Sequence, residues 1–220
     1  MLSVRPPGQA ARSWKDFLIQ IATVAVGLLI ALSLQAGAEW LHWRGEVARG
    51  RERLRQEILF DEQVYVHRVD VASCVEANLT VLKRIVADLQ AKKRVEAVTD
   101  YPSPQNGPIR REVWSSLNAA QIAVHFPPDE LEKYNQFYAN ITDAEYFMDR
   151  ESRDWAQIHL LQGEVNGLSP QEINTLRIAL RDAEEMGSVV TKISKRQIDA
   201  GRSLGIEPPQ EDAKWRVECH

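Results

Sequence analysis

The strongest constraint in this 220-residue sequence is an apolar run from Phe17 to Ala38, 22 residues without a charged side chain or a histidine. A helix rises about 1.5 Å per residue, so the run would cover roughly 33 Å, enough to cross a hydrocarbon core of about 30 Å. Trp14 precedes the run, and Trp40 and Trp43 follow it, where indole rings favour the two headgroup layers. We therefore predict a transmembrane helix over residues 17–38, after a short segment over residues 1–16.

Two other interpretations of the run are a buried core helix and a cleaved signal peptide. A buried core helix is disfavoured because soluble helices seldom extend for 22 residues without a charge. A cleaved signal peptide is the stronger rival, since basic residues precede the run and Ala36-Gly37-Ala38 resembles a cleavage site. The run is longer than the usual signal-peptide core of about 7–15 residues, and the helical pattern continues past it. We favour an uncleaved anchor and keep cleavage after Ala38 as the alternative.

The orientation of the anchor is only weakly encoded. Three basic residues lie before the span and four lie soon after it. The positive-inside rule therefore gives almost no preference and slightly favours a cytoplasmic C-terminal part. The two cysteines, Cys74 and Cys219, favour the opposite orientation, because a small exported domain with two cysteines suggests one disulfide. Alternatively, Cys74 is a small buried hydrophobe and Cys219 a free thiol. We predict a bacterial inner-membrane protein with its N-terminus inside and its C-terminal domain in the periplasm.

The span also carries small residues at helical spacing, Thr23, Gly27 and Ala31. Small residues four apart let two helices approach closely in lipid, where packing drives association. This stripe is a candidate packing face for a homodimer.

The remainder of the chain is predicted to be all-α. No proline occurs between Pro7 and Pro102, so one helix can begin near Ser13 and extend far beyond the membrane, with a kink near residues 69–71. Charged residues such as Glu57 and Arg68 are expected on the solvated face opposite an apolar seam. The seam recurs at spacings of three, four and seven and consists of Leu54, Ile58, Tyr65, Val69, Ala72, Val75, Leu79, Leu82, Val86 and Leu89.

Further helices are expected after a proline-rich loop over residues 99–108. A short helix should cover residues 111–124, and a longer one should begin at Pro127 and continue to Ile158. Residues 169–172, Ser-Pro-Gln-Glu, form a capping box that should open the last helix. We expect a helical extramembrane domain over residues 39–206, in which three or so helices pack on the long one as a bundle or coiled coil, and a tail over residues 207–220.

No sequence motif indicates a catalytic activity. The formal charge of −4 and the pI near 5.8 argue against a nucleic-acid binder. One Glu-x-x-His pair, Glu39 and His42, is too little for a di-iron bundle. An acidic cluster over residues 143–154, which includes Glu151, lacks calcium-loop spacing and is expected to be a solvated face. We therefore expect no enzyme activity, no cofactor and no metal.

The order of several short motifs resembles a group of uncharacterised proteobacterial proteins with one N-terminal span and a helical extramembrane region. The resemblance extends from Trp14 to Ile206 and rests on Val71-Ala-Ser-Cys-Val-Glu76, Val113-Trp114, Glu132-Lys-Tyr134, Gln136-Phe-Tyr138 and Ser203-Leu-Gly-Ile206. It implies no activity and no catalytic residues. If the members are exported, it implies that Cys74 and Cys219 form a disulfide.

Together these observations predict a single-pass membrane protein whose helical domain is an interaction or structural module. The expected partners are the lipid bilayer, a second copy of the chain, or other membrane and envelope proteins. The alternative is a periplasmic helical sensory module that binds a ligand and acts through a partner. An enzyme with an unrecognised site is a third and weaker hypothesis.

Overall fold

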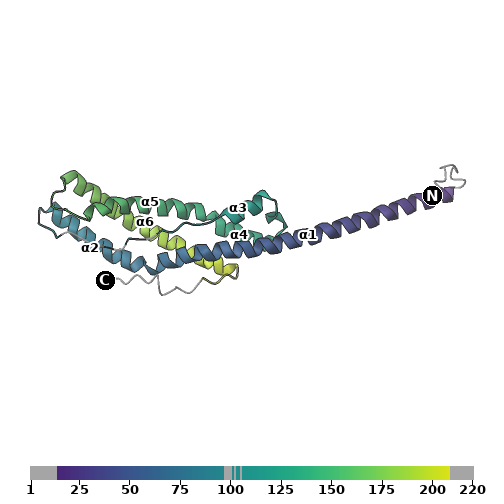
Figure 1. The fold of residues 1–220 in the computed structure, drawn as a ribbon, viewed down its shortest axis with the longest axis horizontal. Helices are drawn as coiled ribbons and strands as arrows, with labels where there is room; N and C mark the ends of the chain where they lie inside the picture. The colour runs from purple at the N-terminus through teal and green to yellow at the C-terminus, as the bar shows by residue number, and fades with distance from the viewer. Residues whose placement is uncertain (1–13, 97–100, 102, 105, 209–220) are drawn as a thin grey trace, which may run out of the picture. The chain divides into compact units, whose positions relative to one another are not determined.

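The computed structural model describes residues 14–96, 101, 103–104 and 106–208, and all regular structure in these residues is helical. This confirms the predicted all-α class. The α-helices, labelled in Figure 1, are α1 (Trp14–Asp70), α2 (Ala72–Gln90), α3 (Glu112–Ala119), α4 (Pro128–Ala139), α5 (Ile141–Ile158) and α6 (Pro170–Ser203). Two short 3-10 helices, η1 (Ala123–His125) and η2 (His159–Leu161), follow α3 and α5.

The chain divides into two units, residues 1–48 and residues 49–220, and α1 contributes to both. In the first unit, the side chains of residues 17–38 are all exposed. By length and apolar composition this part of α1 is sufficient to cross a membrane, and no other helix among the described residues meets that condition. The helix is already formed at Trp14, the first residue that the structure describes, and continues without a break to Asp70, whereas the predicted start near Ser13 lies outside the described residues.

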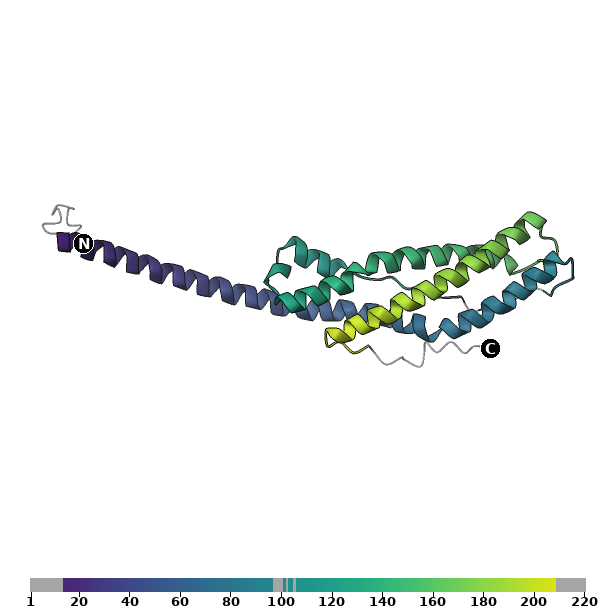
Figure 2. The same ribbon diagram turned by 180° about the vertical axis from the view of Figure 1, so that it is seen from behind.

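In the second unit, α6 is the central helix of a bundle. It packs along α5 and also against α2 and α4. The view from behind shows α6 passing between α5 and α2 (Figure 2). Apolar side chains from α2, α5 and α6 fill one core cluster, whose fully buried members include Leu82, Ile158, Leu161, Leu176 and Leu180.

The break between α1 and α2 falls where the kink was predicted. α1 ends at Asp70 and α2 begins at Ala72, while the backbone N–H of Val71 still donates to the carbonyl of His67 at 3.0 Å. Eight members of the predicted seam are buried, whereas Val69 and Ala72 beside this break are half-buried. The seam therefore faces the bundle core, as predicted.

Two predicted helices are shorter than expected. The helix predicted from Pro127 to Ile158 is divided at Asn140, which ends α4 and precedes α5. The Asn140 side chain donates to the carbonyl of Gln136 at 3.2 Å, and such short polar side chains compete with helical backbone bonds. The helix predicted over 111–124 ends at Ala119, because Gln121 adopts a left-handed conformation with φ +57°.

The capping box is present as predicted. The Ser169 hydroxyl accepts from the backbone N–H of Glu172 at 3.3 Å, and the Glu172 carboxylate accepts from the backbone N–H of Ser169 at 2.7 Å. Both orphan donors at the start of α6 are thereby satisfied.

The connection between α2 and α3 is held to the bundle by side chains. Asn166 makes two hydrogen bonds of 2.9 Å to the backbone of Val95. The Tyr101 hydroxyl donates to the carbonyl of Ile158 at 2.9 Å, and its ring stacks on His159. Asn106 donates to the carbonyl of Met148 at 3.1 Å. These contacts attach a long irregular segment to α5 and its flanking turn.

Candidate functional site

A stripe of polar side chains on α1 lies inside the bundle. We define the polar stripe as Glu57, Asp61, Glu62, Tyr65 and Arg68, of which none is more than 5% exposed. At about 100° per residue, Glu57, Asp61 and Arg68 lie on one side of the apolar seam and Glu62 lies on the other. The stripe is the most unusual feature of the described residues, because buried charges normally require partners.

The prediction that Glu57 and Arg68 lie on a solvated face was wrong. Both side chains are buried, at 5% and 2% exposure. The seam itself is narrow, but helices pack around α1 on both sides of it in the second unit, so the flanking positions are also enclosed. Helical periodicity identifies the centre of a buried face and does not reveal how wide that face becomes after packing.

Glu57 of α1 caps the N-terminus of helix α3, although the two are far apart in the sequence. Its carboxylate accepts from the backbone N–H of Val113 at 2.7 Å and of Trp114 at 3.4 Å, both in the first turn of α3. The Tyr138 hydroxyl donates to the same carboxylate at 2.7 Å, and the Tyr138 ring stacks on Trp114 with centroids 5.1 Å apart. A negative charge at a helix N-terminus is favourable, and burial together with the bond to Glu57 raises the pKa of Tyr138.

Only one of the two carboxylate oxygens of Asp61 has a hydrogen-bond partner among the described residues. One carboxylate oxygen accepts from the backbone N–H of Arg110 at 2.8 Å, whereas Oδ2 has no hydrogen-bond partner among the described residues. Burial raises the pKa of Asp61 to about 8, and the charges of Glu57 and Glu112 act in the same direction. The hydrogen bond from Arg110 opposes this shift.

Glu62 has no hydrogen-bond partner at either carboxylate oxygen among the described residues, although it is fully buried. Burial raises the pKa of Glu62 to about 7, with Arg202 lowering it and Asp199 raising it. The carboxyl group lies against Gly201 of α6, where an added Cβ atom would overlap Oε1. Only a glycine leaves space for this side chain between α1 and α6.

Arg68 forms a buried ion pair with Glu151 of α5. The Nη2–Oε1 distance is 2.6 Å, and the two side chains are 2% and 0% exposed. Arg68 Nη2 also donates to the carbonyl of Gly187 at 3.2 Å, and Asn106 donates to the second Glu151 oxygen at 3.2 Å. A Cβ atom on Gly187 would lie 2.9 Å from Glu151 Oε1, so glycine again makes room for a buried charge.

Two opposing effects act on this pair. Burial raises the pKa of Glu151, which the charge of Arg68 and the bond from Asn106 oppose. Burial lowers the pKa of Arg68, which the charge of Glu151 opposes.

Because Glu151 is enclosed, its predicted place in a solvated acidic cluster was wrong.

Gln197 of α6 continues the buried polar contacts towards α4. Its side-chain amide donates to the carbonyl of Phe137 at 3.0 Å and lies 3.5 Å from the Tyr65 hydroxyl. Burial raises the pKa of Tyr65 well above its usual range, so its hydroxyl stays protonated. The polar stripe therefore connects α1 with α3, α4, α5 and α6.

The predicted membrane residues lie in the first unit. Trp14 and Trp40 are exposed, and Trp43 lies on the same helix. Arg44 stacks over the Trp40 ring, with its guanidinium carbon 5.1 Å from the ring centroid. Amphipathic pairs of this kind suit a membrane–water interface.

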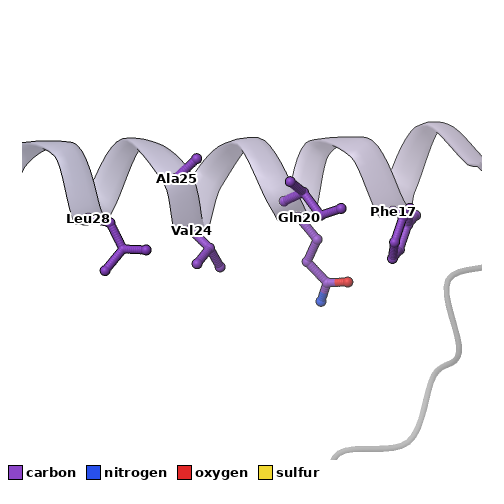
Figure 3. Close-up of a pocket in the computed structure, with 6 residues that line it drawn as sticks. Phe17, Gln20, Val24, Ala25 and Leu28 are labelled. Atoms are coloured by element: carbon purple, nitrogen blue, oxygen red, sulfur yellow. The ribbon is translucent and has the colours of Figure 1, made fainter.

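The face near the start of the apolar run is shown in Figure 3. Phe17, Gln20, Val24 and Leu28 project from the same side of α1. The predicted packing face of Thr23, Gly27 and Ala31 is also uncovered, since nothing beyond the helix itself lies within 4 Å of a Cβ built on Gly27. The Thr23 hydroxyl donates to the carbonyl of Ile19 at 2.8 Å and the Ser33 hydroxyl to the carbonyl of Leu29 at 2.7 Å, so both hydroxyl donors in the span have acceptors.

The predicted disulfide stays a prediction. Cys74 is buried at 2% exposure in α2, whereas Cys219 lies outside the described residues.

Within the described residues, no three or more His, Cys, Asp or Glu side chains are placed to hold a metal ion, and this includes the Glu39–His42 pair. Comparison of the chain with protein-family models, curated proteins and solved structures finds no significant match in any of the three.

The polar stripe can bind protons and can fix how the helices pair, since each buried group has few alternative partners. Sequence reasoning did not single out Asp61, Glu62, Asn106 or Gln197. One available signal was the pair Gly187 and Gly201, because glycine inside a helix costs about 1 kcal/mol relative to alanine and often marks a close approach. Both glycines make room for a buried carboxylate.

Proposed function

We propose that this protein is a single-pass membrane-anchored helical protein whose bundle is an interaction or structural module. The observation that carries the proposal is that all 22 uncharged residues over positions 17–38 of α1 are exposed and that none packs against the rest of the structure. Exposed apolar surface of this extent is strongly unfavourable in water, at about 25 cal/mol per Å², and a bilayer would cover it. The lipid bilayer is therefore the first partner.

The bundle supports a structural role more than a catalytic one. Its core is filled by apolar side chains, and among its buried polar groups Glu57 binds backbone amides while Arg68 and Glu151 bind each other. Such contacts can specify one pairing of helices, which an interaction module needs in order to present a constant surface. The partners would be a second copy of the chain or other membrane or envelope proteins.

The sensory alternative lacks comparable support. A ligand-binding module needs a concave site with a few convergent polar groups. The pocket outlined in Figure 3 lies on one face of the exposed apolar run, and its single polar side chain is Gln20. Lipid chains suit that face better than a small polar ligand.

Charge insertion tests the anchor. Leu28→Arg with Leu29→Arg places two charges at the centre of the apolar run, at a cost of about 2.5–3.5 kcal/mol each on an insertion scale. We expect the wild-type chain to stay in the membrane pellet after alkaline carbonate extraction and this variant to be released. The matched control is Val81→Arg with Val124→Arg, which changes two apolar side chains that are exposed on the bundle. Equal retention of all three chains would contradict the anchor.

In the proposed orientation, the N-terminus lies on the cytoplasmic side of the bacterial inner membrane and the bundle lies in the periplasm. Alkaline phosphatase fused after Ile206 should then be active, because that enzyme needs an oxidising compartment. A cytoplasmic reporter fused at the same residue is the control. An inactive phosphatase beside an active cytoplasmic reporter would reverse the orientation and leave the anchor intact.

A further inference from the structure

We propose that Glu62 is a proton-controlled latch, which in its protonated form holds the C-terminal end of α6, residues 194–203, against α1. The proposal concerns the bundle alone and does not depend on the membrane anchor.

The geometry at Glu62 suits a neutral carboxyl group. The side chain is fully buried, and neither oxygen has a hydrogen-bond partner among the described residues. Oε1 lies so close to the Gly201 backbone that any side chain there would overlap it. An ionised carboxylate without donors is among the least favourable groups that a protein interior can hold, whereas the protonated form is much less costly.

The charged groups that face Glu62 do not compensate for its charge. Arg202 and Asp199, both on α6, are the charged residues that shift its pKa, and they act in opposite directions. Arg202 donates to Asp199 at 3.3 Å, so its positive charge is shared with another carboxylate. Asp61, the preceding residue on α1, is itself buried and has one unpartnered oxygen. Desolvation therefore dominates, and it raises the pKa of Glu62 to about 7.

Deprotonation would favour a state in which water reaches Glu62. The simplest such state separates the last turns of α6 from α1, because Ile198 is the one buried apolar side chain of residues 194–203, whereas the first half of α6 buries several. The polar contacts of this end are the bond of 2.9 Å from Lys133 to the Ser203 carbonyl, the bond of 3.0 Å from Gln197 to the Phe137 carbonyl, and contacts of 3.5 Å between Gln197 and both Tyr65 and Asn140. The first half of α6 stays in place through its fully buried Leu176 and Leu180. The latch would thus open the end of α6 and leave the remaining core packed.

Hydrogen exchange of the full-length chain in detergent micelles tests the latch. We expect the protection factors of the amides in residues 194–203 to fall by about tenfold between pH 6 and pH 8.5, after correction for the intrinsic exchange rate. This is the change expected for an acid whose pKa is about 7 in the closed state and near its ordinary value of 4.5 in the open state. Amides of residues 176–186 should show no comparable loss.

Glu62→Gln is the decisive variant, since its neutral amide has nearly the shape of the protonated acid. We expect the protection of residues 194–203 in this variant to be independent of pH, while Glu52→Gln, an exposed site on the same helix, behaves like wild type. Equal loss of protection in Glu62→Gln and wild type would overturn the proposal. If Glu62→Gln does not fold, ¹³C NMR of the Glu62 carboxyl group in the wild-type chain decides, because a pKa near 4.5 would also overturn it.

Discussion

Arg68 of α1 and Glu151 of α5 form an ion pair with 2.6 Å between Nη2 and Oε1, and both side chains are closed to solvent. They are 83 residues apart in the sequence. Gly187 of α6 lies against both, so three helices meet at this pair. The pair shows how charged residues that looked like surface positions became part of the interior.

Removal of one partner of this pair should be strongly destabilising. Glu151→Leu leaves Arg68 buried and unpaired, which typically costs about 3–5 kcal/mol in the free energy of unfolding. Arg68→Met combined with Glu151→Leu should be less destabilised than Glu151→Leu alone, because no charge is then left without a partner. Urea unfolding of the full chain in detergent measures both.

The exposed pair Lys93–Asp88 provides the control for this experiment. Its side chains are 67% and 39% exposed, so solvent screens the pair and Asp88→Ala should leave the free energy of unfolding almost unchanged. If Arg68→Met with Glu151→Leu is as unstable as Glu151→Leu alone, the change in side-chain volume, and not the unpaired charge, causes the loss of stability.

The bond between Tyr138 and Glu57 should stabilise α3 specifically. Tyr138→Phe removes the hydroxyl donor and leaves a less satisfied buried carboxylate, so the free energy of unfolding should fall by about 1–2 kcal/mol. Glu57→Leu should cost more, since it also removes the acceptor of the Val113 and Trp114 amides. Thermal unfolding measures both changes, and hydrogen exchange of α3 localises them. Tyr146→Phe, at an exposed tyrosine, should have almost no effect.

The free energy of unfolding should decrease as pH rises. Burial raises the folded-state pKa values of Asp61 and Glu62 to about 8 and about 7, above their ordinary values of 3.8 and 4.5. For groups with raised pKa values, the folded state binds more protons, so the stability present below pH 4 is lost as pH rises through 7 to 8. We expect a loss on the order of 5 kcal/mol between pH 5 and pH 9 in wild type, to which both groups contribute.

Asp61→Asn isolates one part of this pH dependence, because asparagine keeps an acceptor for the Arg110 amide but does not titrate. Chemical denaturation at pH 5, 7 and 9 should give a flatter profile for this variant than for wild type. Identical profiles would show that Asp61 is ionised throughout this range.

The predicted disulfide between Cys74 and Cys219 can be tested directly. Peptide mass spectrometry of the unreduced chain should find the two cysteines in one cross-linked fragment. Closing so long a loop should stabilise the fold by about 4–5 kcal/mol on the chain-entropy estimate, which reduction would remove. Alkylation of Cys219 without prior reduction would contradict the disulfide and weaken the case for a periplasmic bundle.

Association through the span should depend on its small residues. Gly27→Ile fills the uncovered stripe of Thr23, Gly27 and Ala31, and we expect it to reduce dimer formation in detergent or in a membrane reporter assay. Ala25→Ile adds a similar volume on a different side of the helix and is the control. A dimer that is unaffected by Gly27→Ile would mean that this stripe is not the contact.

Local sequence patterns predicted the parts of this protein that depend on local physics. The apolar run, the seam from Leu54 to Leu89 and the Ser169 capping box each depend on residues that are neighbours on a helix surface or at a helix end, and all three are present. The division at Asn140 was missed because its side chain bonds both to its own helix and towards Gln197 of α6, at 3.5 Å. The second contact lies outside any local window.

The sequence by itself determined that the chain is helical and that residues 17–38 form an apolar, uncharged stretch, because both properties follow from residue type and period. Only the tertiary structure decided which charges are buried. Glu57, Glu62 and Arg68 occupy the edges of an amphipathic helix, and an edge becomes core or surface according to which helices pack beside it. Burial of a charge depends on distant partners such as Glu151 and on space such as that at Gly201, and helical periodicity contains neither.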